Sequence, residues 1–119
     1  MIDKEEYEKE LKEFSDLKEK LAKKERYFID LYCEACKIMS FVLEVFSLKA
    51  EVNYSDYRET LSRFSKDGAI IHVCGFDRHK LNGTPFVDSY CREIVPFELL
   101  FDPNWEETVK NIAAMKEII

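Results

Sequence analysis

The sequence predicts an α+β domain, in which a long N-terminal helical hairpin or kinked helix precedes a short helix, a small antiparallel β-sheet and a C-terminal helix. Residues 1–67 contain neither Gly nor Pro and repeat apolar side chains at helical spacing. Two runs of β-forming residues then flank an Asn-Gly pair, which is typical of a hairpin turn. The chain has 119 residues, 46% of them hydrophobic, so we expect one domain over 1–119, with a helical spine at 1–50 and a smaller α+β part at 51–119.

The N-terminal region has a heptad pattern about forty residues long. Asp3 can cap its start, with Glu6 in capping-box spacing. The pattern allows one long helix or two, and the polar stretches 14–16 and 23–26 are the candidate breaks. We favour two segments, near 3–24 and 26–50, joined by no more than a kink. The apolar row consists of Tyr7, Phe14, Leu21, Phe28, Ala35 and Val42, and a second row of Leu17, Leu31, Ile38 and Val45.

The second helical segment is unusually apolar. Residues 27–48 contain 16 apolar side chains in 22 positions, and their charges fall on one narrow stripe. A small domain has difficulty covering such a helix on every side. We therefore expect a homo-oligomer that associates through the helix at 26–50.

The C-terminal part is expected to be mixed. Ser55 can cap a short helix that ends at Gly68, and 69–76 reads as a strand that turns at 82–83 and returns over 91–95. Pro96 places that returning strand at a sheet edge or bulge. The last helix is expected to start with Asp102 as its cap and Pro103 at its first helical position, and to keep helical spacing from Trp105 to Ile119.

Composition excludes several classes of protein. The net charge is −6, and only residues 52–92 are net positive, so nucleic acid is an unlikely partner. No stretch of 18 residues lacks charge, which argues against a membrane span. The charged N-terminus and four cysteines predict a cytoplasmic protein with reduced thiols. The bias toward Lys, Glu, Ile, Phe and Tyr is typical of AT-rich genomes, including phages and other mobile elements.

The cysteines allow two kinds of chemistry. Cys33 and Cys36 form a C-x-x-C pair, the spacing of redox couples and of half a zinc site. They lie within an apolar heptad, however, so core packing is the favoured interpretation. A two-residue turn at 82–83 would place Cys74 opposite Cys91. No metal, no cofactor and no catalytic residue is predicted.

The same register would place His72 opposite Glu93, which adds a possible ligand pair, but it would also oppose Asp77 to Asp88. Like charges directly across a ladder are destabilising. A longer loop over about 77–89 therefore accounts better for this stretch.

The predicted ligand site lies in 76–92, where arginines and aromatic side chains gather in an otherwise acidic chain. Arginine forks bind phosphate or carboxylate, and aromatic rings stack on bases or sugars. We expect a non-enzymatic binding protein for a small anionic ligand such as a nucleotide. The alternative is a protein–protein interaction module, an inhibitor or adaptor, acting through its helices or acidic surface. The candidate ligand-binding residues are Arg58, Arg63, Phe76, Arg78, His79, Lys80, Asn82, Phe86, Tyr90 and Arg92.

Overall fold

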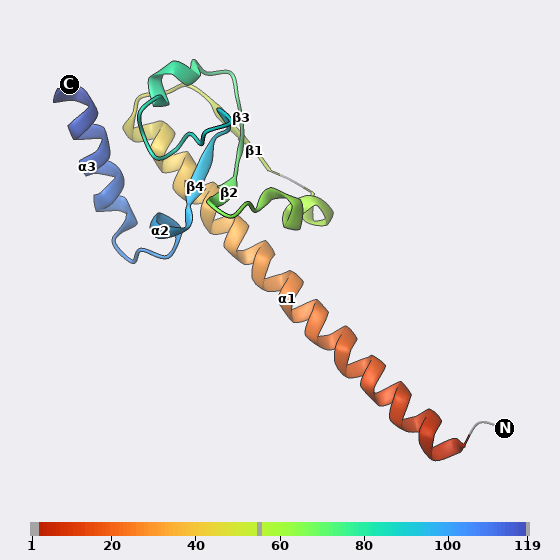
Figure 1. Ribbon diagram of the computed structural model, residues 1–119. Coiled ribbons are helices and arrows are strands. Elements are labelled where there is room, and N and C mark those ends of the chain that lie inside the picture. Colours follow the sequence, from red (N-terminus) through yellow and green to blue (C-terminus); the bar gives the residue numbers. More distant parts are fainter. Residues whose placement is uncertain (1–2, 55, 119) are drawn as a thin grey trace.

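One uninterrupted helix, α1 (Lys4–Val45), makes up the N-terminal third of the chain. The computed structural model describes residues 3–54 and 56–118, and Figure 1 shows α1 running from a compact body into solvent. Asp3 caps the helix by accepting a hydrogen bond from the Glu5 amide at 3.2 Å. The expected division near residue 25 is wrong: neither polar stretch contains a residue that breaks a helix, so the hydrogen-bond ladder continues through both.

The helix ends at Val45, earlier than the predicted residue 50, through a Schellman turn. Ser47 adopts the left-handed conformation with φ 56°. The Leu48 amide donates to the carbonyl of Leu43 at 2.8 Å, and the Ser47 amide donates to that of Glu44 at 3.0 Å. These two bonds satisfy carbonyls that would otherwise lack partners. Leu43 and Leu48 are both buried, which completes the motif with an apolar contact.

The β-structure consists of two small antiparallel sheets instead of the expected single sheet. β1 (Glu51–Asn53) pairs with β3 (His72–Cys74), and β2 (Gly68–Ile70) pairs with β4 (Ile94–Pro96). The predicted strand 69–76 is therefore divided at Ile71, which is 1% exposed. Its two halves diverge to different partners.

The two-residue hairpin turn at 82–83 is not formed, and the cross-strand pairs derived from it are wrong. The longer loop over about 77–89, which the opposed aspartates favoured, is present instead. Cys74 lies opposite Glu51, and His72 lies opposite Asn53. Asn82 instead ends a one-turn 3₁₀ helix, and Gly83 follows it with φ 81°. Gly83 therefore provides the left-handed conformation for a turn within a loop. It does not connect two paired strands.

Four short helical elements complete the described chain. They are η1 (Tyr57–Arg63), η2 (Arg78–Leu81), α2 (Phe97–Leu100) and α3 (Trp105–Ile118). Ser55 and Ile119 lie outside the described residues, and Asp56 caps η1. Pro103 lies before α3 instead of in its first turn, although Asp102 does accept hydrogen bonds from the Asn104 amide and the Thr108 hydroxyl, both at 2.8 Å.

Gly68 has a different purpose from the predicted helix stop. It lies in β2 opposite Pro96, and a Cβ atom there would come within 2.2 Å of the Val95 carbonyl oxygen. The close approach of two backbones therefore requires glycine at this position.

The C-terminal half of α1 is the centre of the core. It contacts η1, β1, β4, α2 and α3, which pack around it in Figure 1. Phe41 packs edge-on against Trp105, with ring centroids 5.3 Å apart. The chain thus covers most of the apolar helix itself, so the reason for expecting self-association through 26–50 does not hold. The buried residues of α1 are Tyr32, Ala35, Cys36, Ile38, Met39, Val42 and Leu43.

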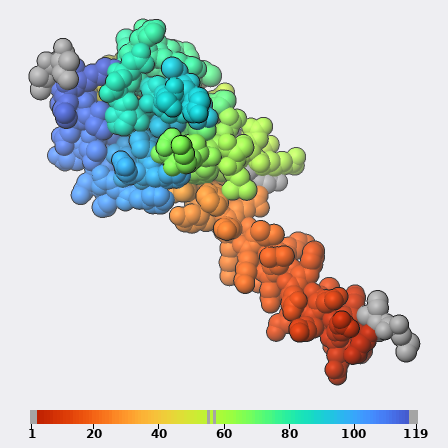
Figure 2. Space-filling model, in the orientation of Figure 1, coloured from red at the N-terminus to blue at the C-terminus, as the bar shows by residue number. Residues whose placement is uncertain are grey.

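The N-terminal half of α1 projects from this body as an arm, defined here as residues 4–27. Every described residue of the arm is exposed, and the molecule measures 75 × 27 × 22 Å. Figure 2 shows the arm as a bare rod beyond the body. At 1.5 Å per residue the arm is about 36 Å long. Among the described helices, none combines the length and the apolar character needed to cross a membrane.

The division between arm and body predicts two different mutational costs. Met39→Ala should lower the free energy of unfolding by about 2–5 kcal/mol, because it leaves a cavity in the core. Leu17→Ala, on the arm, should change it by less than about 0.5 kcal/mol. Urea unfolding of dilute protein, followed by Trp105 fluorescence, measures both. Equal losses would contradict the division.

Candidate functional site

The region predicted to bind a ligand is a loop, residues 75–93, anchored in the core. Leu81 and Phe86 are fully buried, and Thr84 is 8% exposed. The Thr84 hydroxyl donates to the Leu81 carbonyl at 2.6 Å. Phe86, a predicted ligand contact, is therefore a core residue that holds the loop, and its ring lies 6.2 Å from that of Phe46.

The chain reverses at residues 88–92 instead of at the Asn-Gly pair. The Ile94 amide donates to the Phe86 carbonyl at 2.9 Å, and the Asp88 amide donates to that of Arg92 at 3.0 Å. Cys91 occupies the left-handed region with φ 60°. The Asp88 carboxylate accepts the amides of Tyr90 and Arg92, at 2.9 and 2.8 Å. Asp88 therefore acts as the organising residue of this turn.

Arg92 is tied to the same carboxylate. Its Nε and Nη2 both lie 2.8 Å from Asp88 Oδ2, and its guanidinium lies 5.0 Å from the centroid of the Tyr90 ring. Burial would raise the pKa of Asp88, but the hydrogen bonds from Arg92 and Tyr90 outweigh it, so the net shift is downward. Arg92 therefore lies beside Tyr90, as predicted. Its guanidinium is already paired with the Asp88 carboxylate of the same turn.

Arg78 has a partner of a different kind. Its Nε lies 2.8 Å from Oε1 of Glu93, whose side chain is 6% exposed. Among the described residues no aligned hydrogen bond reaches that oxygen. A buried carboxylate costs several kcal/mol unless a counter-charge accompanies it. Arg78 therefore stabilises the loop by neutralising Glu93.

The remaining predicted residues of this loop are scattered. Phe76 packs against the core, and His79 and Lys80 are exposed on η2. The carbonyl groups of Lys80 and Asn82 both accept the Lys116 ammonium, which fastens η2 to α3. Asn82 also lines a cleft of about 510 Å³ together with Gly83, Thr84, Pro85, Ile112, Met115 and Lys116.

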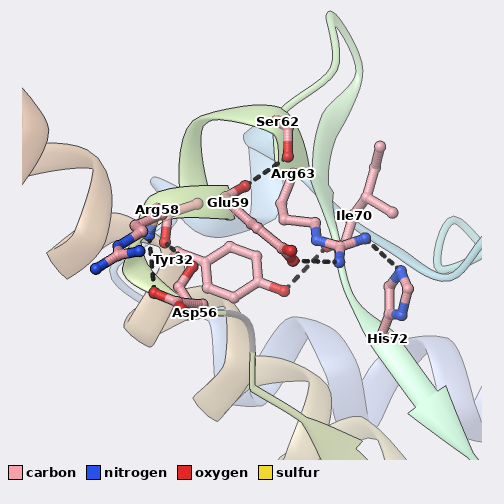
Figure 3. Close-up of polar contacts among 9 residues, drawn as sticks. Tyr32, Asp56, Arg58, Glu59, Ser62, Arg63, Ile70 and His72 are labelled. Atoms are coloured by element: carbon pink, nitrogen blue, oxygen red, sulfur yellow. Dashed lines mark hydrogen bonds and ion pairs between the residues drawn. The ribbon is translucent and has the colours of Figure 1, made fainter.

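Arg58 and Arg63 belong to a separate polar cluster on η1, shown in Figure 3. Arg63 Nη2 lies 3.1 Å from Glu59 Oε2, and its Nη1 contacts Nε2 of His72 on β3. A recess of about 170 Å³ adjoins the cluster, lined by Asn53, Tyr54, Asp56, Glu59, Arg63 and His72.

The C-x-x-C pair lies half inside and half outside the core. Cys36 is fully buried, and burial raises the pKa of its thiol to about 11. Its thiolate is therefore scarce at neutral pH, as the packing interpretation expects. Cys33 is exposed, in contrast to that interpretation. The described part of the chain contains no group of three or more metal-type ligands.

An apolar surface without a covering element lies on the arm. Five of its apolar side chains, spaced three or four residues apart, line one side of the helix and form what is here called the arm stripe. The sequence pattern showed four of these residues but missed Leu11 and gave no sign that they would be uncovered. The residues and their exposures are Tyr7 55%, Leu11 54%, Phe14 65%, Leu17 56% and Leu21 59%.

Charge is distributed unevenly along the arm. Residues 3–13 carry six acidic and three basic side chains, whereas residues 14–26 carry three acidic and five basic ones. The arm is therefore acidic at its far end and basic next to the body.

Comparison with protein-family models, curated protein sequences and solved structures gave no match.

The Arg78–Glu93 pair predicts a stability effect that an exposed arginine would not have. Arg78→Ala should lower the free energy of unfolding by about 1–3 kcal/mol, because Glu93 is left buried without a counter-charge. Glu93→Gln in the same chain should recover most of the loss. Arg26→Ala on the arm is the matched control and should be neutral. Denaturant unfolding of the wild type, Arg78→Ala, Arg78→Ala/Glu93→Gln and Arg26→Ala measures these free energies. An Arg78→Ala variant as stable as the wild type would show that the pair does not stabilise the fold.

Proposed function

We propose that this protein is a protein–protein interaction module and that the arm of α1 is its docking element. The observation that carries the proposal is the arm stripe: five large apolar side chains, each more than half exposed, on a helical segment whose residues are all exposed. Contiguous apolar surface of this kind marks an interaction site more often than a free surface.

The arm is also poorly suited to existing alone. Isolated helices are marginal in water, and most helical stability in proteins comes from packing an amphipathic face. The body supplies that packing only from about Phe28 onward, where the ring meets Phe64 at 5.3 Å. An arm of about 36 Å with a continuous apolar side is thus completed by another helix, in the manner of helix-in-groove or coiled-coil recognition.

The loop arginines support this choice over a ligand pocket at 76–92. Arg78 and Arg92 already neutralise Glu93 and Asp88. An anion bound to either arginine would have to displace the carboxylate that the arginine now contacts. That buried carboxylate would then lose its counter-charge, which costs free energy.

A photo-crosslinking amino acid tests the docking function in the cells that produce the protein. Placed at Leu17, on the arm stripe, it should give one defined product, mapped by mass spectrometry to the apolar side of a helix. Placed at Asp16, on the opposite side, it should not. Equal crosslinking from both positions, or none from Leu17, would contradict the docking role.

Binding of a small anion is the second candidate, and the recess beside Arg63 is the observation that favours it. Arg63 and His72 line this recess, and Arg58 lies on the same short helix. Asp56 and Glu59 share it, so an anion would have to use the arginine fork in competition with Glu59. This candidate therefore depends on Arg63 and not on Arg78 or Arg92.

Thermal-shift measurements with ATP and with inorganic phosphate test the second candidate. A ligand at about 100 times its dissociation constant stabilises by about 2.7 kcal/mol, a shift of several degrees for a domain of this size. Arg63→Gln should abolish that shift and Arg26→Gln should retain it. The absence of a shift in the wild type, or an equal shift in Arg63→Gln, would reject the recess as an anion site.

A further inference from the structure

The five residues of the arm stripe are spaced symmetrically about Phe14. Successive steps from Tyr7 through Leu11, Phe14 and Leu17 to Leu21 are four, three, three and four residues. The stripe therefore has the same spacing in both directions. Two antiparallel copies with their Phe14 side chains facing each other bring Tyr7 opposite the partner's Leu21, and Leu11 opposite the partner's Leu17. Steps of three and four residues keep apolar side chains at the seam of a helix pair.

We propose that the arm binds a second copy of this chain, as an antiparallel helix pair centred on Phe14. This inference rests on the proposed docking function and names its partner. It also moves self-association away from 26–50, which the body covers, to a surface that the chain leaves open.

The length of the arm fits this register. With the Phe14 residues opposed, Asp3 lies opposite the partner's Glu25, so residues 3–25 of the two copies overlap. The body begins to cover α1 at Phe28, which is the first partly buried residue of the helix. Each body therefore begins just beyond the end of its partner's arm, and no apolar residue of the stripe is left without a counterpart.

The body excludes the parallel alternative because it stands on the same face of α1 as the stripe. Phe14, Leu21, Phe28 and Ala35 share heptad spacing and hence one face of the helix. Ala35 is fully buried in the body, and Phe28 packs against it. Two parallel copies would bring both bodies into the space between the helices and hold the arms apart. Antiparallel copies place the bodies at opposite ends.

Charge favours the same orientation. The far end of the arm, 3–13, is acidic and the near end, 14–26, is basic. An antiparallel pair lays the acidic half of each arm on the basic half of the other, whereas a parallel pair lays like on like. The opposed helix dipoles add to this preference.

Specific charges flank the seam in the proposed register. Glu8 and Glu10 lie on either side of the stripe in the acidic half, as Lys18 and Lys20 do in the basic half. In an antiparallel helix pair, each flanking residue lies next to the partner's flanking residue on the same side of the seam. Glu8 therefore lies next to the partner's Lys18, and Glu10 lies next to the partner's Lys20. Two-fold symmetry repeats both pairs, which gives four opposite-charge contacts.

Sedimentation equilibrium of the full chain tests the proposal, with charge reversal as the probe of orientation. The wild type should be a dimer. Glu8→Lys/Glu10→Lys and Lys18→Glu/Lys20→Glu should each weaken the dimer by about 10-fold or more, since four attractive contacts become repulsive. An equimolar mixture of the two variants should restore wild-type association, because every flanking pair is again opposite in charge.

The control is Glu5→Lys/Glu19→Lys, which makes the same change of net charge on the side away from the stripe and should leave association within about twofold of the wild type. A wild type that stays monomeric up to about 100 µM would overturn the second-copy proposal. A dimer that ignores Glu8→Lys/Glu10→Lys, or two variants that fail to complement each other, would overturn the antiparallel pairing. A monomer whose Leu17 crosslinks to a different protein would leave the docking function standing, so the two failures are distinguishable.

Discussion

The C-terminal half of α1 is the constraint on which the rest of the structure depends. Both sheets, η1, α2 and α3 reach their positions by packing on or next to this one helical segment. Because the strands are only three residues long and pair two by two, neither sheet has a core of its own. The helix supplies the apolar surface that makes them stable. The same apolar periodicity continues into the arm, where the chain provides nothing to cover it.

This arrangement also explains the character of the loop at 75–93. The loop crosses the end of the body and must bury Leu81 and Phe86 while turning sharply at 88–92. Two carboxylates, Asp88 and Glu93, become buried side chains as a result. Arg78 and Arg92 offset that cost, which is why arginines concentrate here in an acidic protein. The arginines that suggest a ligand pocket in the sequence thus mainly neutralise buried carboxylates of the same loop.

Much of the fold could be predicted from local pattern. Apolar heptads identified α1, and Asp3 was correct as its capping residue. Asp102 instead accepts the amide of Asn104, which precedes α3, so it lies before the predicted cap position. The continuity of α1 was missed because charged residues around Lys23 resemble a loop, although each is a good helix former. The sheet pairing was missed for a different reason. Asn82-Gly83 is a strong hairpin signal, but the burial of Leu81 and Phe86 on either side fixes it as a loop turn. Tertiary packing of this kind has no local signature.

The candidate surface shows the same limit. The apolar row containing Phe14 and Leu21 was visible in the sequence, but periodicity alone does not say whether a stripe is covered. Only the placement of the body, which ends near Phe28, separates the buried part of the row from the exposed part. The symmetric spacing about Phe14 becomes meaningful once the stripe is known to be uncovered.

Amide hydrogen exchange of the full chain at low and high protein concentration tests the central claim most directly. A lone arm frays and exchanges quickly, whereas an arm packed on a second copy is protected. The account predicts that protection of residues 4–26 rises with concentration, while that of 28–45 stays constant. Arm protection that is independent of concentration would contradict the claim that a second copy completes this helix.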